Sequence, residues 1–270
     1  MTKTLNHVDL CFVIDTTGSM GGFIQEAKQQ LLDTIRLLSA DSDIDLQVGL
    51  VEYRDHPPQD TTFVTRIYPL TANLQEMQKN INKLEADGGG DHPEAVYDGV
   101  LDAANQMKWR RNSCRFILLV GDAPPHGFQA DRDSDGFTHT DSARYPNGLT
   151  VQWVTAAAEN QRVTVHALCM GGDRSCVQSF TANRQGRRFA IATGTGGQCA
   201  SVRDAKDVIC QIVTMLKGEF RDLEFDRKVL QNVQRLGNLD ISATADALGC
   251  PRLQVASAIA RLGKRGFLEF

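Results

Sequence analysis

The sequence predicts an α/β fold, a doubly wound and mostly parallel β-sheet flanked by helices. Short apolar runs rich in β-branched residues alternate with segments of helical period, which is the pattern of a parallel sheet buried on both faces. Two of these runs, 10–15 and 116–122, end abruptly in aspartate. Open α/β sheets bind their ligands outside the carboxyl ends of the strands, so both carboxylates are candidates for function.

Each predicted element follows from its own pattern. Apolar, β-branched runs predict strands at 10–15, 44–53, 61–68, 116–122 and 163–170, and a short strand and turn from Phe189. Apolar residues recurring every three to four positions predict helices at 23–39, 73–84, 93–107, 152–159 and 204–216. Pro93 suits the first turn of its helix. A long polar segment, 123–148, separates the strand ending at Asp122 from the next helix.

The pattern changes near Gly218. Three helices are predicted at 225–236, 242–248 and 251–262, and a closing strand at 266–270. Ser242 is the expected cap of the second helix and Gly249 its end. Short helices around a glycine turn, followed by a strand, resemble a winged helix-turn-helix. We therefore expect a large domain over 1–217 and a small one over 218–270.

Composition narrows the function classes. The formal net charge is −4, so the whole chain has neither a strongly basic field nor an acidic tail. Residues 1–9 lack the apolar core of a secretory signal, and no apolar run approaches the roughly 18 residues of a membrane span. The seven cysteines are scattered without a C-x-x-C pair. We expect a cytoplasmic, bacterial protein with reduced thiols and no membrane contact.

The strongest motif follows the first strand. Asp15, Thr17 and Ser19 lie at alternate positions on the predicted loop. One carboxylate and two hydroxyls are hard oxygen donors, which suit a small divalent cation such as Mg²⁺. Asp122 ends the other buried strand, and a triple-glycine loop presents Asp91. If all three loops share one sheet edge, these side chains can converge on one ion.

These motifs resemble the von Willebrand factor A domain and its metal-ion-dependent adhesion site. Asp15-Thr16-Thr17-Gly18-Ser19 matches the first loop of that family, and Asp122 matches its strand-end aspartate. The family's usual threonine after a glycine pair is absent, and Asp91 follows the glycines instead, either as a direct ligand or through water. The Gly-Gly-Gly-Asp-x-Pro-Glu loop and the later Asp-Ala-Pro-Pro-His-Gly resemble the subgroup attached to alpha-type kinases. The resemblance covers about 7–217.

The resemblance implies a non-catalytic, cation-dependent interaction protein. Its Mg²⁺, with Mn²⁺ or Ca²⁺ as alternatives, would be completed by an Asp or Glu of a partner protein. An alternative is a metal-dependent hydrolase or phosphatase in which Asp15 is the nucleophile. Phosphatases of that type carry a second acid two residues later, where this chain has Thr17. In that alternative His126 is the candidate general base.

Further candidates lie outside this motif. Asp131, Asp133 and Asp135 resemble the start of a calcium loop, although its twelfth position is serine. His166, Cys169 and Cys176 make a weak zinc candidate, because strand positions three apart point to opposite faces. A transcription regulator is the second functional interpretation. Its DNA or partner contacts would be Arg252, Gln254, Ser257, Arg261, Lys264 and Arg265.

Overall fold

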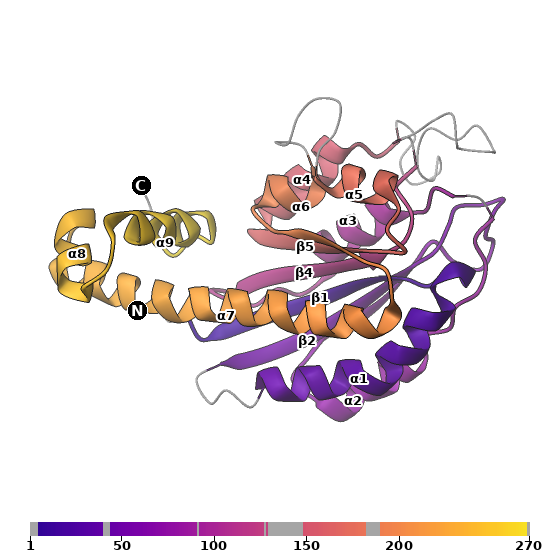
Figure 1. Ribbon diagram of the computed structural model, residues 1–270, viewed down its shortest axis with the longest axis horizontal. Helices are drawn as coiled ribbons and strands as arrows, with labels where there is room; N and C mark the ends of the chain where they lie inside the picture. Colours follow the sequence, from indigo (N-terminus) through magenta and orange to yellow (C-terminus); the bar gives the residue numbers. More distant parts are fainter. Residues whose placement is uncertain are drawn as a thin grey trace.

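The computed structural model describes residues 5–39, 44–90, 92–126, 128, 148–181 and 190–268. One six-stranded sheet has the order β3-β2-β1-β4-β5-β6 (Figure 1). Its strands are β1 (His7–Asp15), β2 (Asp45–Tyr53), β3 (Thr65–Thr71), β4 (Cys114–Gly121), β5 (Val163–Met170) and β6 (Cys199–Val202). All neighbours are parallel except β2 and β3, which pair antiparallel. The predicted α/β class is confirmed.

Helices cover both faces of the sheet (Figure 1). One face packs against α1 (Gly21–Ser39), α2 (Leu74–Asn82) and α7 (Ala205–Leu236). The other packs against α3 (Val96–Gln106), α4 (Val151–Asn160), α5 (Arg174–Thr181) and α6 (Ile191–Thr195). A short 3₁₀ turn, η1 (Gly18–Met20), joins β1 to α1. Among the described residues, no helix is both long and apolar enough to cross a membrane.

The alternation of side chains along β1 explains this double covering. Phe12 and Ile14 pack into the core beneath α1 and α7, whereas Cys11 and Val13 pack on the α3 side. Both faces of β1 are buried from Leu10 to Ile14, which is why this part of the strand is one continuous apolar run. On the α3 side, a Cβ at Gly99 would lie only 2.9 Å from the Tyr53 ring. Glycine at this position therefore permits the close packing of α3 on the sheet.

Several predicted elements differ from the structure. Residues 191–195 form the helix α6 instead of the predicted strand, and the edge strand is β6. A short apolar run does not distinguish a buried strand from a buried helix, which explains the error. Helix α5 was not predicted, and α3 begins at Val96, so Pro93 precedes the helix. Strand β5 has the predicted bounds.

The predicted helices 204–216 and 225–236 are parts of one helix, α7. The expected domain boundary at 217/218 therefore lies inside a continuous helix. Helix α8 (Ile241–Leu248) is capped by Asp240, whose carboxylate accepts from the Ala243 amide at 2.9 Å, and not by the predicted Ser242. After α9 (Arg252–Lys264), residues 266–268 are turn and bend where a strand was predicted. Residues 269–270 lie outside the described part.

Candidate metal centre

Three loops meet at the carboxyl edge of the sheet, between β1 and β4. This is the switch point of the strand order, where open α/β sheets form their binding crevice. The Gly18 amide donates to the Gly88 carbonyl at 3.1 Å, which places the glycine loop on the loop that follows β1. The Glu94 amide donates to the Pro124 carbonyl at 3.0 Å, which joins the glycine loop to the loop after β4. The predicted convergence of the three loops is therefore found.

Asp15 is the buried centre of this edge. Its Oδ1 accepts from the Thr17 amide at 2.9 Å and from the Thr17 hydroxyl at 2.7 Å. The Thr17 and Ser19 hydroxyl oxygens lie 3.3 Å apart, and Ser19 is exposed. Asp15 Oδ2 is buried and has no hydrogen-bond partner among the described residues. One oxygen is thus held by the loop while the other remains available to a ligand.

The electrostatics of Asp15 also favour a cation. Burial, and secondly the charge of Asp122, raise the pKa of the Asp15 carboxyl to about 7, against the hydrogen bonds from Thr17. A divalent cation beside the two carboxylates would reverse this effect by stabilising their ionised forms. The donors are carboxylate and hydroxyl oxygens, the set that Mg²⁺ takes. The residues present therefore fit the predicted ion.

The glycine loop needs its glycines. Gly88 and Gly89 have φ of +71° and +77°, a left-handed backbone that side chains rarely adopt. A Cβ at Gly88 would overlap the Asp60 carboxylate, and one at Gly89 would lie 3.1 Å from both Thr17 Cβ and Glu94 Oε1. The buried guanidinium of Arg54 donates to the Glu85 carbonyl at 2.9 Å and anchors the start of the loop. Glycine thus lets this loop approach the Asp15 loop closely.

Two residues at this edge were missed by the sequence analysis. Glu94 is buried, and its carboxylate approaches the Gly89 backbone beside Thr17. The buried Tyr53, at the end of β2, has its pKa raised first by burial and then by nearby acidic groups that include Asp15, Asp122 and Glu94. The Tyr53 hydroxyl is therefore within electrostatic range of three carboxylates. The only sequence signal for Glu94 is its place in the Gly-Gly-Gly-Asp-x-Pro-Glu loop, three residues after Asp91.

The comparisons with known proteins agree with this architecture. A family model of the von Willebrand factor A domain matches residues 9–204. The chain belongs to this family. Two solved structures share the fold of its von Willebrand factor A (vWA) domain. The first is the pilus adhesin SpaC of Lactobacillus rhamnosus GG in an open conformation, with a TM-score of 0.52 and 15% identity; the match covers 81% of this chain and 30% of SpaC. The second is proximal thread matrix protein 1 of the mussel byssus, with a TM-score of 0.51 and 13% identity; the match covers 79% of this chain and 46% of that protein.

Two curated relatives are similar in sequence over about half of this chain. Alpha-protein kinase vwkA of Dictyostelium discoideum is 32% identical over 143 residues, which are 53% of this chain and 22% of the kinase. The putative ariadne-like RING finger protein R811 of Acanthamoeba polyphaga mimivirus is 30% identical over 127 residues, 47% of this chain and 12% of that protein. This chain therefore spans less than a quarter of the length of either relative.

The remaining predicted ligands of the vWA domain divide into two groups. Asp122 follows β4 and lies close enough to Asp15 to raise its pKa. Asp91 lies outside the described residues, as do the predicted calcium-loop positions Asp131, Asp133 and Asp135.

The weak zinc candidate is not assembled, because His166 contacts Phe116 and Glu219 on one face of the sheet, while Cys169 packs in the core on the other face.

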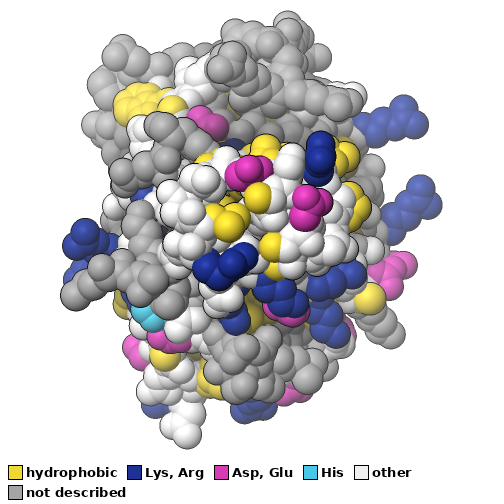
Figure 2. Space-filling model, turned by 90° about the vertical axis from the view of Figure 1, so that its left-hand side faces the viewer, with side chains coloured by type: hydrophobic (Ala, Val, Ile, Leu, Met, Phe, Trp, Pro, Cys, Tyr) yellow, Lys and Arg dark blue, Asp and Glu magenta, His cyan; other side chains and the backbone are white. Residues whose placement is uncertain are grey.

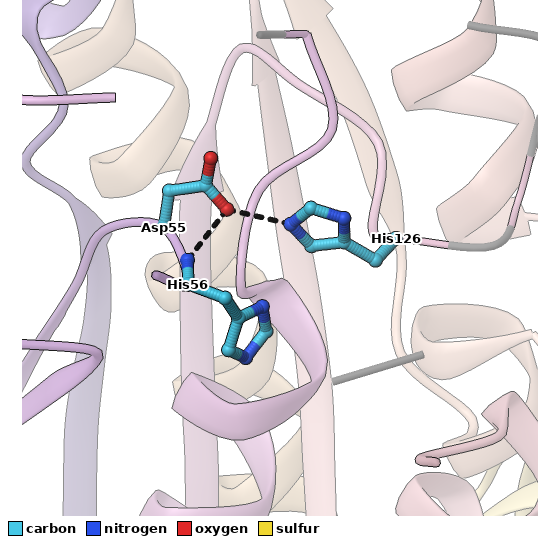
Figure 3. A group of neighbouring side chains, drawn as sticks. All are labelled: Asp55, His56 and His126. Atoms are coloured by element: carbon cyan, nitrogen blue, oxygen red, sulfur yellow. Dashed lines mark hydrogen bonds and ion pairs between the residues drawn. The ribbon is translucent and has the colours of Figure 1, made fainter. Parts of the chain in front are cut away.

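A second polar group lies at the same edge of the vWA domain (Figure 3). Asp55, His56 and His126 are all buried, and one possible ligand atom from each lies within 4.8 Å of the others. Among the described residues, no other group of three or more His, Cys, Asp or Glu is close enough to share an ion. His126 Nε2 contacts Asp55 Oδ1 at 2.6 Å, so this histidine is engaged inside the fold.

The predicted contact residues after the vWA domain also divide into two groups. Arg265 is buried and pairs with Glu219 at 2.8 Å and Asp226 at 3.3 Å, and Arg261 pairs with Asp226 at 2.5 Å. Lys264 Nζ donates to the Gly194 carbonyl at 3.4 Å. Arg252, Gln254 and Ser257 are exposed on α9. Figure 2 views this end of the molecule and shows basic side chains interspersed with hydrophobic and acidic ones.

Proposed function

We propose that this chain is a non-catalytic interaction protein whose vWA domain holds Mg²⁺ and docks an acidic group of a partner protein. The ion would be bound by Asp15, Thr17, Ser19 and Asp122, with Asp91 as a further ligand, direct or through water. When bound, the cation supplies a positively charged docking point that a carboxylate can complete. The proposal rests above all on the buried Asp15, whose Oδ2 lacks a hydrogen-bond partner among the described residues.

The surroundings of Asp15 support docking better than hydrolysis. Thr17 donates its hydroxyl to Asp15 Oδ1, where a phosphatase of the alternative type needs an acid. The candidate base His126 is buried and in contact with Asp55. Ser19, by contrast, is exposed, so a partner carboxylate can approach the ion from this side. Segments similar to this chain occur in a kinase and in a RING finger protein, as expected for a module that is fused to different domains.

The first experiment measures the ion itself. Titration calorimetry of the chelator-treated protein should show one Mg²⁺ site, replaceable by Mn²⁺ or Ca²⁺. Asp15→Asn should abolish this binding while circular dichroism shows an unchanged fold. Asp33→Asn is the matched control, because Asp33 is an exposed acid on α1 paired only with Arg36 in the described contacts. Mg²⁺ binding that survives in Asp15→Asn contradicts the proposed site.

The second experiment measures partner capture. Quantitative mass spectrometry compares the proteins captured in three conditions. These are the immobilised wild-type chain in Mg²⁺, the same chain in EDTA, and the Asp15→Asn variant in Mg²⁺. Partners should be retained only by the wild-type chain in Mg²⁺. For each such partner, one Asp→Asn or Glu→Gln variant should remove binding. Capture that is unchanged in EDTA argues against cation-dependent docking even if Mg²⁺ binds.

A second candidate function, a transcription regulator, is favoured by one observation. Helices α8 and α9 are joined by a short turn through Gly249, and the exposed Arg252, Gln254 and Ser257 share the first turns of α9. A helix-turn-helix presents the start of its second helix to the major groove. A gel shift with random-sequence DNA tests this function. Arg252→Ala should reduce the shift, and the absence of any shift at low salt removes the candidate.

A further inference from the structure

Asp55, His56 and His126 come from two elements that flank the Asp15 loop. Asp55 and His56 follow Tyr53 at the end of β2, and His126 lies four residues after Asp122 (Figure 3). The rings of His56 and His126 lie with their centroids 5.0 Å apart and their planes tilted by 56°. The function proposed above uses none of these three side chains. They therefore require a separate explanation.

The orientation of His56 points to a ligand. Its Nε2 lies 3.0 Å from Asp98 Oδ2, and because a carboxylate accepts, Nε2 is the donor there. The ring's other nitrogen, Nδ1, then carries a lone pair, yet it is buried and has no hydrogen-bond partner among the described residues. Figure 3 shows this nitrogen facing Asp55 and His126. An unsatisfied buried acceptor is costly, and a bound cation would satisfy it.

The Asp98 contact is itself typical of a metal site. A histidine that binds a metal nearly always donates its second ring N–H to a carboxylate, a carbonyl or water, which fixes the tautomer and the ring. Asp98 lies on α3, is completely buried and bonds His56 in this way. The imidazole is therefore held with its free nitrogen aimed at the other two side chains before any ion arrives.

The donor set distinguishes this group from the Asp15 site. Two imidazoles and one carboxylate are the ligands of zinc, whereas Asp15 and its neighbours offer only oxygen. We propose that Asp55, His56 and His126 form a zinc site, separate from the Mg²⁺ site at Asp15. The ligand atoms are Asp55 Oδ1, His126 Nε2 and His56 Nδ1, and water completes the shell.

Zinc binding requires a small rearrangement and a change of tautomer at His126. The 2.6 Å contact between His126 Nε2 and Asp55 Oδ1 is a hydrogen bond, so a proton lies between the two atoms. The zinc ion takes the place of this proton, which moves through solvent to the other ring nitrogen of His126, so that the imidazole stays neutral and zinc forms one bond to each atom. Two zinc bonds of about 2.0–2.1 Å in tetrahedral geometry separate the ligand atoms by roughly 3.3 Å.

The test uses the whole chain in the Asp15→Asn background, with excess Mg²⁺ present, so that zinc at the Asp15 site does not contribute. Calorimetry should detect one zinc ion per chain. His56→Gln should remove this binding, and Asp98→Asn should weaken it by about 10- to 100-fold, as loss of a supporting carboxylate does. His7→Gln is the matched control, because His7 is partly exposed and lies at the opposite end of β1. The zinc affinity of the His7→Gln variant should equal that of its parent.

A second measurement avoids variants of the buried residues. In the same Asp15→Asn chain, zinc should shift the ring-nitrogen NMR signals of two of the 6 histidines and leave the others unchanged. The proposal is overturned if zinc shifts no histidine signal, or if His56→Gln binds zinc as tightly as its parent. In either case the group is a hydrogen-bond network only. Because Asp15 is absent from these experiments, their failure would not affect the proposed Mg²⁺ function.

Discussion

Thr17 donates both its backbone amide and its hydroxyl to the same oxygen of Asp15, Oδ1. Both bonds come from the loop that directly follows β1, so the carboxylate is fixed by its own neighbours. The other oxygen, Oδ2, is left buried without a partner among the described residues. This asymmetry gives the site one oriented ligand atom, and it has measurable consequences for pH dependence.

The stability of the metal-free protein should fall as pH rises from about 4 to about 7. The pKa of Asp15 is raised from 3.8 to about 7 in the folded state, so the folded state binds this proton more tightly than the unfolded chain. The contribution is fully present below the unfolded value and lost above the folded one. Each pKa unit corresponds to about 1.36 kcal/mol, which gives a maximum loss of about 4 kcal/mol.

Urea unfolding in EDTA at several pH values measures this effect. The difference between wild type and Asp15→Asn isolates the contribution of Asp15, because the other titrating groups are shared. This difference should decline with pH in EDTA, and saturating Mg²⁺ should abolish the decline. A difference that is constant with pH in EDTA would contradict the role assigned to Asp15.

Gly88→Ala should destabilise the glycine loop. A methyl group there meets the Asp60 carboxylate and must adopt φ of +71°, which costs about 1–3 kcal/mol. Gly22→Ala on α1 is the matched control, since no atom lies within 4 Å of the position that its methyl group would take. That change removes a helical glycine and should stabilise the protein by about 0.5–1 kcal/mol. Chemical denaturation measures both, and equal effects would show that the loop conformation is not critical.

Gly121→Ala should weaken cation binding. The added methyl group would overlap the Tyr53 hydroxyl and lie 3.4 Å from Asp15 Oδ2. Because both groups are buried, Tyr53 must move within the cluster of carboxylates. Overpacking of this kind costs about 1–3 kcal/mol of stability. Calorimetry should show a weaker Mg²⁺ affinity in a folded variant, and an unchanged affinity would place the ion away from Asp15 Oδ2.

Asp226→Asn should loosen α9 from α7. Asp226 is buried and compensates Arg261 and Arg265, so its removal leaves two cations without this partner and costs about 3 kcal/mol or more. Hydrogen exchange in α9 should accelerate. Glu224→Gln is the control on the same helix, because its pair with Lys228 is exposed. Exchange in α9 should stay at the wild-type rate in that variant, and an equal acceleration in both would argue against the buried pairs.

Local patterns predicted much of the fold and part of the site. Strand β5 has the predicted bounds, because its positions are buried and mostly apolar, and Arg162 and Gly171 flank the run. Asp15 and Asp122 were placed correctly at one edge, since parallel strands end on the same side of a sheet. The merged α7 was not predicted, because Gly218 and the charged residues of 217–224 interrupt the apolar pattern. Within this segment of α7, Glu219 pairs with His166 and Arg265, which are distant in the sequence.

The α/β class and the Asp15-Thr17-Ser19 loop could be read from the chain alone, because both depend on residues that are close together in it. Three-dimensional packing was needed to bring Asp55 to His126, which is 71 residues away, and to set Glu94 beside Thr17. It also engaged Arg261 and Arg265 with acids of α7, although the sequence offered them as contacts for DNA or a partner. Buried charged and polar groups must find partners wherever the fold places them, and those positions are set by strand order and helix packing.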